Sequence, residues 1–234
     1  EINLLNKHNN SALHLASAKG YVEIVKLLIQ YGADVTQTDR RNNATAAHIA
    51  AHEGHARVLK VLFKQNKDLV TMCDMHGATP IIVSAQFGGS ECVIECLIAD
   101  SNINDRLQAG TFKGATPLYS AVYAEKFDTC KFLIKYGADV NIQTDAGWSP
   151  LHVAVDKGLF DYVKLLVNNG AVFANTSTSM KTNEGKSVYM IAQEKGYSNI
   201  LNFLVLKSTS AQNVSLQPKK IPIWGSRKDN SLQS

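Results

Sequence analysis

The stretch SPLHVAVDKG, residues 149–158, places one histidine, His152, among apolar residues. Taken alone, this histidine could be a catalytic base, a metal ligand or one copy of a repeated feature. Similar stretches occur five more times, 33 to 38 residues apart, and begin at Ser11, Thr45, Thr79, Thr116 and Ser187. Self-similarity at a nearly constant period of this length is typical of stacked structural repeats. The recurrence therefore favours a structural role for His152.

Each repeat begins with signals for a pair of helices. A serine or threonine before an apolar run caps a helix, and the proline that follows it in three repeats needs no hydrogen bond at the first helical position. A second apolar stretch then recurs at helical spacing, as at Val22, Val25 and Leu28. Because one helix pair cannot cover its own apolar face, neighbouring pairs must stack into a continuous core.

A glycine stands nine residues after the capping residue in five repeats, where a turn should join the two helices. These glycines are Gly20, Gly54, Gly88, Gly158 and Gly196. Glycine adopts the positive φ of such a turn at little cost. The fourth repeat has Glu125 at this place. We therefore expect its turn to close differently and its first helix to be longer.

The chain resembles the ankyrin-repeat family, whose pattern is T-P-L-H-x-A, then a glycine, a V-K-L-L helix and G-A-D-V-N. Residues 1–36 and 116–172 match this pattern nearly whole, and the resemblance covers about residues 1–207. It implies an all-α solenoid of stacked helix–turn–helix units with protruding hairpin loops, here called fingers. The repeats are expected near residues 1–36, 37–70, 71–104, 105–141, 142–173 and 174–207.

The resemblance implies a structural role for the repeat histidines His14, His48 and His152, which in the family hydrogen-bond backbone between neighbouring repeats. The other three repeats have Ile82, Tyr119 and Met190 at this position, which argues against catalysis. The sequence HEGH at residues 52–55 spaces its histidines three apart, whereas the HExxH zinc motif needs four. No phosphate-binding glycine loop, acid–base pair or nucleophile motif is present. We therefore expect no metal, no cofactor and no enzymatic activity.

Charge and cysteine usage narrow the class of partner. The last 30 residues carry five basic residues and one acidic residue, which leaves 19 of each in the rest of the chain. A neutral array argues against nucleic acid as a partner, because phosphate binding needs a concentrated basic face. The four cysteines form no CxxC pair and no apolar run reaches 18 residues, so we expect reduced thiols and no membrane span. A cytoplasmic monomer is expected, with the nucleus or a host cytosol as alternative locations.

The expected function is non-catalytic protein–protein interaction. In the family, the residues free to vary lie at the finger tips and just before the turn between the helices. In the middle repeats, apolar and aromatic side chains at these positions have polar neighbours, which is the usual composition of a binding hot spot. The candidate binding residues are Met75, His76, Phe87, Phe112, Lys113, Tyr123, Asp145, Trp148 and Asp156. We predict that the concave face of repeats three to five binds an apolar peptide or helix; alternatively, some of these aromatics pack against the longer finger before Thr116.

Two fingers are longer than the others, and the chain has a distinct end. NDRLQAGTFKG and FANTSTSMKTNEG contain the inserted residues, which either carry recognition or reflect tolerated length drift. Residues 1–11 align with residues 139–149, so we expect further repeats upstream. Residues 208–234 form a polar, basic tail that is either flexible or docked as a short peptide through KKIPIWG.

Two wider roles also fit the sequence. The array could be the regulatory or substrate-recruiting domain of a larger enzyme, channel or ubiquitin-ligase assembly. It could also be a microbial effector that acts on host proteins, with the polar C-terminal tail as its translocation signal.

Overall fold

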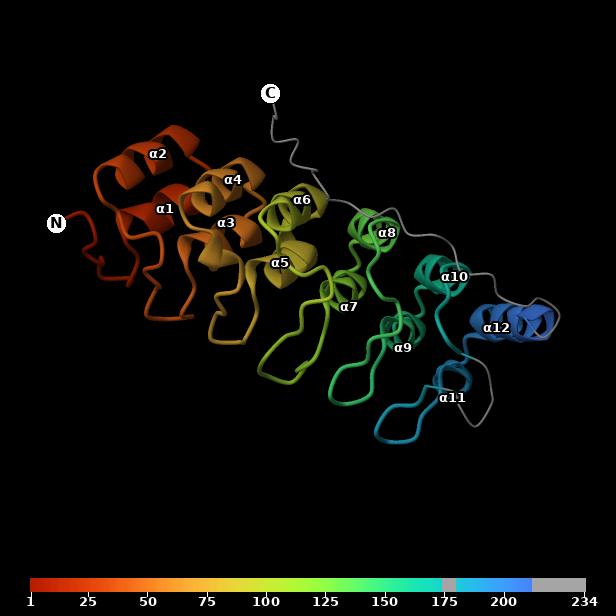
Figure 1. Ribbon diagram of the computed structural model, residues 1–234. Coiled ribbons are helices and arrows are strands. Elements are labelled where there is room, and N and C mark those ends of the chain that lie inside the picture. Colours follow the sequence, from red (N-terminus) through yellow and green to blue (C-terminus); the bar gives the residue numbers. More distant parts are fainter. Residues whose placement is uncertain (174–179, 212–234) are drawn as a thin grey trace, which may run out of the picture.

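The computed structural model describes residues 1–173 and 180–211, and these form a row of helix pairs (Figure 1). The first helices of the pairs are α1 (Ala12–Ala18), α3 (Ala46–His52), α5 (Pro80–Val83), α7 (Pro117–Tyr123), α9 (Pro150–Asp156) and α11 (Val188–Glu194). The second helices are α2 (Val22–Gln30), α4 (Ala56–Gln65), α6 (Ser90–Ile98), α8 (Phe127–Lys135), α10 (Phe160–Asn168) and α12 (Ser198–Ala211). A 3-10 turn, η1 (Lys67–Val70), follows α4, and a π-helical turn, η2 (Ser84–Gly88), follows α5. The prediction of an all-α solenoid is confirmed.

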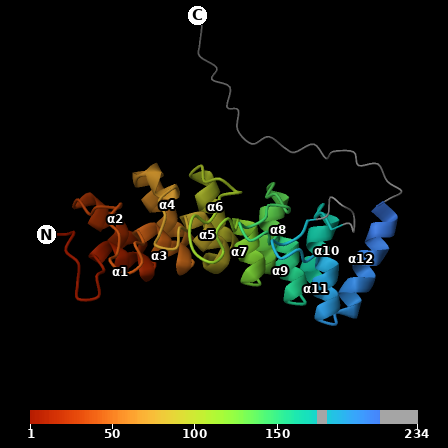
Figure 2. The same ribbon diagram turned by 90° about the horizontal axis from the view of Figure 1, so that it is seen from below.

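The helices lie in two rows, and the fingers hang from one side (Figure 1). The second helices form the outer row, and the first helices lie next to the fingers. Seen from below, the pairs follow one another along the array in chain order (Figure 2). Each first helix packs against the next, as α1 does on α3 and α7 on α9. We call the surface made by the first helices and the fingers the inner face.

Packing between the pairs produces one continuous apolar core. The seventh residue of α4 is Leu62, and Leu133 in α8 and Leu166 in α10 occupy the same place in their helices. All three side chains are completely buried. Each pair thus supplies the same apolar positions to its neighbours, as a stacked solenoid requires.

The repeat histidines lie buried at the start of their helices. The Nδ1 atoms of His14, His48 and His152 each accept a hydrogen bond from the backbone N–H of the capping residue, at 3.1 to 3.2 Å. The remaining proton therefore belongs on Nε2, which in His48 lies 3.0 Å from the carbonyl oxygen of Ala78 in the next repeat. Among the described residues, the buried Nε2 atoms of His14 and His152 have no partner at hydrogen-bond distance, although backbone acceptors at Ala44 and Lys186 lie near enough to favour the protonated rings. Burial lowers the pKa of all three imidazoles, to about 4 for His152.

Backbone hydrogen bonds tie each finger from the second to the sixth to its neighbour. Met75 N donates to Asn42 O at 2.6 Å, Asp145 N to Lys113 O at 2.8 Å, and Asn183 N to Ala146 O at 3.0 Å. Between the third and fourth fingers the bond runs from Gln108 N to Gly77 O, at 2.9 Å. The fingers therefore form a connected layer rather than a set of independent loops.

The third repeat differs from the expectation for its turn. The π-helical turn η2 extends the first helix, so the positive φ falls on Gly89 (79°) and not on Gly88. Gly88 serves another purpose, because a Cβ there would collide with the backbone carbonyl oxygen of Ala51. The prediction of a positive φ at Gly88 is therefore wrong, and close approach of two backbones explains this glycine.

The expectation for the fourth repeat is also wrong. Glu125 adopts the left-handed φ of 59°, and Lys126 N donates to Ala121 O at 2.8 Å as Tyr21 N donates to Ala16 O at 3.0 Å in the first repeat. Helix α7 has seven residues, as do α1, α3 and α9. The turn closes in the usual way, at the conformational cost of a side chain in the left-handed region.

Two expectations from the sequence concern the C-terminal part of the chain, which the structure describes as far as residue 211. Helix α12 runs to Ala211, four residues past the expected end of the array at 207. The rest of the tail, including Ile221, Ile223 and Trp224, lies outside the described residues, as do residues 174–179 of the last finger. Among residues 1–173 and 180–211, no helix has the length and apolar character needed to cross a bilayer.

Candidate protein-binding site on the inner face

A hollow of about 310 Å³ opens between α7, α9 and the two fingers that precede them. We call it the aromatic hollow. Its lining consists of Thr111, Phe112, Tyr119, Tyr123, Thr144, Ala146, Trp148, Val153, Asp156 and Lys157. The candidate binding residues Phe112, Tyr123, Trp148 and Asp156 are among them. Side chains from two repeats and two fingers thus converge on one concave place.

Three rings of the fourth repeat form one wall. The ring of Phe112 lies 4.8 Å from that of Tyr123 and 6.2 Å from that of Tyr119, measured between centroids, and both pairs are tilted. Phe112 and Tyr123 are 39% and 38% exposed, so each presents a substantial apolar surface to a ligand. Across the hollow, the half-buried ring of Trp148 meets His152 edge-on at 6.1 Å. Such preformed aromatic surface is what binding hot spots offer.

Two of these aromatics replace residues that the stacking uses elsewhere. Tyr119 occupies the place of the repeat histidine, and Trp148 occupies the place before the capping residue where three other repeats have a buried alanine. Because Tyr119 has no imidazole, this junction has no histidine to reach the backbone carbonyl of the next repeat as His48 reaches that of Ala78. Burial, followed by the nearby Tyr123 and Asp156, raises the pKa of Tyr119 to about 12. Its phenol stays protonated at neutral pH.

The insertion before Thr116 places Phe112 in the hollow. In neighbouring fingers, the residue four positions before the cap, such as Met75 or Asp145, donates its backbone N–H to the previous finger. In the fourth finger Gln108 makes that contact, and Leu107 N pairs with Ala115 O at 2.9 Å to close the extra loop. Phe112 is therefore not used in the finger-to-finger ladder. The longer finger delivers an aromatic side chain to the inner face.

The charged groups of the aromatic hollow are already paired. Lys157 Nζ lies 2.8 Å from a carboxylate oxygen of Glu125 and 4.9 Å from the centroid of the Tyr123 ring. Asp156 forms an ion pair with Lys195 at 3.1 Å. Since each charge has a partner within the protein, the rim has little net field. The hollow suits an apolar or aromatic group better than a charged one.

A second hollow, of about 470 Å³, lies between α3, the α5–η2 segment and their fingers. We call it the histidine hollow. Its lining is Asn10, Asp39, Arg41, Asn42, Ala44, His48, Ile49, His52, Glu53, Asp74, His76, Val83 and Phe87. The candidate residues His76 and Phe87 belong to it, and the Phe87 ring packs 4.4 Å from that of His52. Its carboxylates Asp39 and Asp74 accept backbone N–H groups within their own finger turns.

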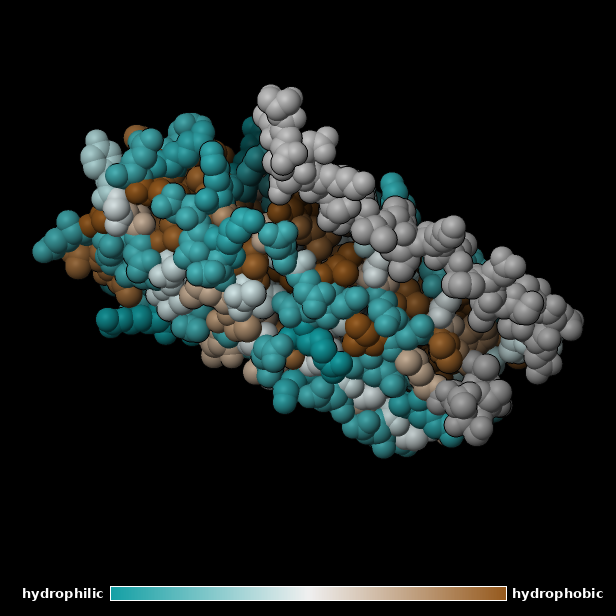
Figure 3. Space-filling model, viewed as in Figure 1, coloured by the Kyte–Doolittle hydropathy of each residue, from teal (hydrophilic) through white to brown (hydrophobic). Residues whose placement is uncertain are grey.

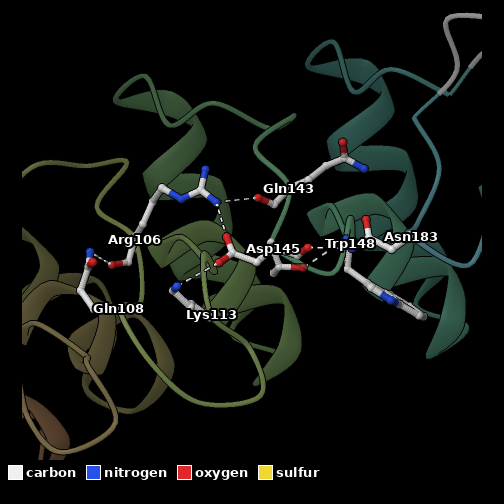
Figure 4. A network of polar contacts seen from close by, with 8 residues as sticks. Arg106, Gln108, Lys113, Gln143, Asp145, Trp148 and Asn183 are labelled. Carbon is white, nitrogen blue, oxygen red and sulfur yellow. Dashed lines mark hydrogen bonds and ion pairs between the residues drawn. The ribbon is translucent and has the colours of Figure 1, made fainter.

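The remaining candidates lie at the finger tips. Asp145 lies between Arg106, at 3.1 Å, and Lys113, at 3.5 Å, while the Asn183 side chain donates to its backbone carbonyl at 2.8 Å (Figure 4). These contacts join three consecutive fingers. The side chain of Met75 is 54% exposed on the third finger, outside both hollows. The nine candidate residues therefore divide into two hollows, a bridging ion-pair network and one exposed methionine.

Six of the ten residues that line the aromatic hollow are not among the candidate binding residues, and Tyr119 and Lys157 are the two with ring or charge contacts. The sequence identifies Tyr119 only as a replacement for the repeat histidine, and Lys157 is not among the predicted binding residues. The available signal for Tyr119 is its combination with Trp148, because the histidine position of one repeat and the position before the cap of the next both carry an aromatic residue. Lys157 lies just before the turn glycine, at a position that the family leaves free to vary, but its contact with the Tyr123 ring depends on how two helices pack.

The described residues offer no clear site for metal or thiol chemistry. Within residues 1–173 and 180–211, no three His, Cys, Asp or Glu side chains gather closely enough to hold a metal ion. The cysteines are unpaired, and burial raises the pKa of the Cys92, Cys96 and Cys130 thiols to about 12. Such thiols are protonated and unreactive at neutral pH.

Comparison with known proteins points to one family. A family model described as ankyrin repeats (3 copies) matches residues 1–73, 48–144 and 128–216. The crystal structure of the ankyrin repeat domain of Bcl-3 superposes with a TM-score of 0.74 at 26% identity, covering 88% of this chain and 86% of that one. The mouse B-cell lymphoma 3 protein homolog is 27% identical over 95% of this chain and 47% of its own length. Human protein phosphatase 1 regulatory subunit 27 is 40% identical over 58 residues, which are 25% of this chain and 38% of the relative. The chain thus spans less than half the length of either curated relative.

Proposed function

The chain belongs to the ankyrin-repeat family and is a protein–protein interaction module, and from that premise we propose that its aromatic hollow receives an apolar side chain of a partner peptide or helix. The partner lies along the inner face of repeats three to five. Its anchoring residue contacts Phe112, Tyr123 and Trp148. Phe87 and the exposed Met75 extend the contact toward the third repeat.

One observation carries the proposal: the departures from the repeat pattern converge on this hollow. Tyr119 stands for a histidine, Trp148 for an alanine, and Phe112 is delivered by an inserted loop. Glu125 stands for a glycine and holds Lys157 over the Tyr123 ring. Stacking requires none of these residues, because the other repeats stack without them. Their concentration at one place is best explained by recognition.

The lining sets the chemistry of the partner. Aromatic rings cover two sides, and the paired groups Asp156 and Lys157 leave the rim nearly neutral. A charged side chain would lose hydration there without gaining a free counter-charge. An aromatic or large aliphatic residue would bury apolar surface against three rings, which stabilises binding by roughly 25 cal/mol per Å².

Fluorescence of Trp148 gives a direct test of occupancy. The chain has two tryptophans, so a Trp224→Phe background leaves Trp148 as the only emitter. Peptides selected on the parent chain from a displayed library of helical and extended sequences serve as ligands. We expect selected peptides to share an aromatic or aliphatic anchor and to shift Trp148 emission.

Substitutions then locate the site. Tyr123→Ala should weaken binding by about 2 kcal/mol or more if the ring is an anchor. Tyr136→Ala is the matched control, because Tyr136 is exposed at the end of the outer helix α8 and packs on Phe132, not on the hollow. Equal binding by the parent and both variants would show that partners use another surface. Affinity capture from lysate with the same variants would identify the natural partner.

The wider setting of the module is also a proposal. Relatives include the Caenorhabditis elegans transient receptor potential cation channel subfamily A member 1 homolog, of which this chain covers 17%. The Arabidopsis thaliana E3 ubiquitin-protein ligase XBAT33 is covered over 32%. A regulatory or substrate-recruiting domain of a larger protein is therefore a second candidate role. We further propose a cytoplasmic monomer, which sedimentation of the purified chain and imaging of the tagged protein would test.

A further inference from the structure

The outer helix α6 departs from the repeat pattern on the side that faces away from the fingers. Its fifth residue is Ile94, where α2, α4, α8 and α10 have Lys26, Lys60, Lys131 and Lys164. Its ninth residue is Ile98, where the same four helices have Gln30, Lys64, Lys135 and Asn168. Ile94 and Ile98 are 36% and 67% exposed. Two positions that neighbouring repeats keep polar are therefore apolar in α6 and face water.

The same change leaves the acidic residues of α6 without ion pairs. In α2, α8 and α10 the second residue is acidic and pairs with the lysine at the fifth position, at 2.6 to 2.7 Å. Glu91 is the second residue of α6, and Ile94 stands where that lysine would be. Within residues 1–173 and 180–211, neither Glu91 nor Glu95 has an ion-pair partner. Two carboxylates beside the exposed isoleucines are therefore available to basic groups of a ligand.

The apolar surface continues onto the next outer helix, α8, which packs beside α6. The sixth residue of an outer helix faces the preceding pair, because Val61 and Leu165 are partly buried whereas Leu27 of the first described pair is 51% exposed. Phe132 is the sixth residue of α8 and so faces α6. The ring of Tyr136, which is 45% exposed, lies 4.4 Å from that of Phe132. We give the name outer apolar strip to Ile94, Ile98, Phe132 and Tyr136.

The outer apolar strip has the spacing that a helix recognises. Ile94 and Ile98 are four residues apart, as are Phe132 and Tyr136, so each pair forms a ridge along its side of the strip. The side chains of a third helix can pack between two such ridges. Figure 3 shows hydrophobic side chains at the surface near α6 and α8. Exposed apolar surface with a polar rim is typical of protein interaction sites.

The charges beside the strip differ between its two edges. Glu91 and Glu95 lie on the α6 edge, and the α8 edge has Lys131, which pairs with Asp128, and Lys135. A bound helix with basic residues on one edge would pair them with the two glutamates and keep them away from the lysines of α8. Beyond the glutamates, the cations of α4 limit how far that basic edge extends; these are Arg57, Lys60 and Lys64.

We propose that the outer apolar strip is a second protein-binding surface, which takes an amphipathic helix of a partner protein. The apolar side of that helix packs on Ile94, Ile98 and the Phe132–Tyr136 pair. Lysine or arginine residues along one of its edges pair with Glu91 and Glu95. The inference is independent of any ligand in the aromatic hollow, which lies on the opposite, inner face.

A displayed library of helices tests the strip on the full chain. Each member carries leucines at two positions four residues apart, and its other outward-facing positions are randomised. Selection on the parent chain is followed by counter-selection on the Ile94→Lys, Ile98→Lys double variant. We expect the retained helices to carry lysine or arginine along one edge. Retained helices without that basic edge, or no helix that distinguishes the two chains, would overturn the proposal.

The double variant should fold as the parent does, because lysine is what α4 has at both equivalent positions, Lys60 and Lys64. Thermal melting checks this. A retained helix should bind the double variant at least about tenfold more weakly than it binds the parent. Tyr123→Ala should leave that affinity unchanged, because Tyr123 lies in the aromatic hollow. A loss for Tyr123→Ala alone would place the helix in the hollow and would overturn the strip while supporting the hollow.

Charge reversal tests the orientation of the bound helix. Glu91→Lys with Glu95→Lys should weaken binding of a basic-edged helix by about tenfold and restore binding of the same helix with glutamates on that edge. Glu23→Lys is the control at the equivalent position of α2, and it should leave both affinities unchanged. Affinities that do not respond to the reversal on α6 would overturn the proposal.

Two other occupants of the strip would give different results. A chain that ends at residue 211 and binds the helix more tightly than the full chain would assign the strip to residues 212–234. Sedimentation of the parent as a dimer that the double variant dissociates would assign it to a second copy of the chain. Either result would overturn the proposal of a partner helix.

Discussion

The aromatic hollow and the histidine hollow are built from equivalent parts of neighbouring repeats, yet their chemistry differs. In the histidine hollow, His48 reaches the Ala78 carbonyl and the stacking pattern of the family is intact. In the aromatic hollow, Tyr119 replaces the histidine of that contact, and Trp148 stands at the position whose backbone carbonyl is the acceptor in the histidine hollow. The comparison teaches that a repeat junction becomes available for recognition where its stacking chemistry is replaced by side chains that the solenoid does not need.

The two hollows also use different means to present a phenylalanine. The π-helical turn η2 carries Phe87 to His52, whereas an inserted finger loop carries Phe112 to Tyr123. The π-helical turn η2 lies in the core of the array, whereas the inserted loop of the fourth finger lies on its surface. We therefore expect changes at the histidine hollow to affect stability and changes at the aromatic hollow to affect binding.

Gly88→Ala should have the largest effect on stability. The new methyl group would collide with the carbonyl oxygen of Ala51, and both backbones are fixed by helices. We expect the free energy of unfolding to fall by about 3 kcal/mol, the upper range for overpacking. Urea unfolding measures it. Gly196→Ala is the control, since it has φ 73° but no atom within 4 Å, and should lose only about 1 kcal/mol. Equal losses would show that the close approach at Gly88 is not the dominant constraint.

Phe112→Ala and Phe87→Ala should separate the hollows by affinity. Phe112 contacts two rings of the aromatic hollow, so its loss should weaken binding of a selected peptide by about 2 kcal/mol. Phe87 lies beside His52 at the edge of the proposed contact, and its loss should cost less than about 0.5 kcal/mol. Titration calorimetry with one peptide compares them directly. A larger loss for Phe87 would place the anchor in the histidine hollow.

Lowering the pH should destabilise the contacts between repeats that contain a buried repeat histidine. It should not affect the contact in which Tyr119 takes the place of that histidine. An unfolded histidine has a pKa near 6.5, and burial holds His152 at about 4 in the folded chain. Between these values the unfolded state binds more protons, so the free energy of unfolding falls as the pH falls. One such group contributes about 1.4 kcal/mol per pH unit in that window, and His14 and His48 shift in the same direction.

Urea unfolding at pH 7.0, 5.5 and 4.5 measures this dependence. His152→Tyr is the informative variant, because Tyr119 shows that a tyrosine fits the equivalent position. Its phenol does not titrate in the window, so the variant should lose less stability on acidification than the parent. Identical pH dependence in the two chains would assign the acid sensitivity to other groups.

Much of the fold could be predicted from residues with local, repeated roles. Ser11 and Ser149 cap their helices, and apolar spacing marks the buried faces, so element type and stacking order follow from sequence. The errors at Gly88 and Glu125 arose because a glycine can serve close packing as well as a positive φ, and a non-glycine can tolerate that φ. At the site, aromatic positions were predictable. The pairing of Asp156 with Lys195 was not, because it depends on distances between helices.

Glu125→Gly should give the smallest effect, and a stabilising one. Glu125 holds φ 59°, which costs a residue with a side chain about 1 kcal/mol relative to glycine. Its ion pair with Lys157 is partly exposed and offsets less than that. The free energy of unfolding should therefore rise by about 0.5 to 1 kcal/mol. Glu125→Gln separates the two contributions, because it removes the charge and keeps the strain, and it should not stabilise the chain. A Glu125→Gly variant that is more stable but binds the peptide more weakly would show that Glu125 acts on binding through Lys157 and the Tyr123 ring. The strained backbone at this turn would then be maintained because it supports binding in the aromatic hollow.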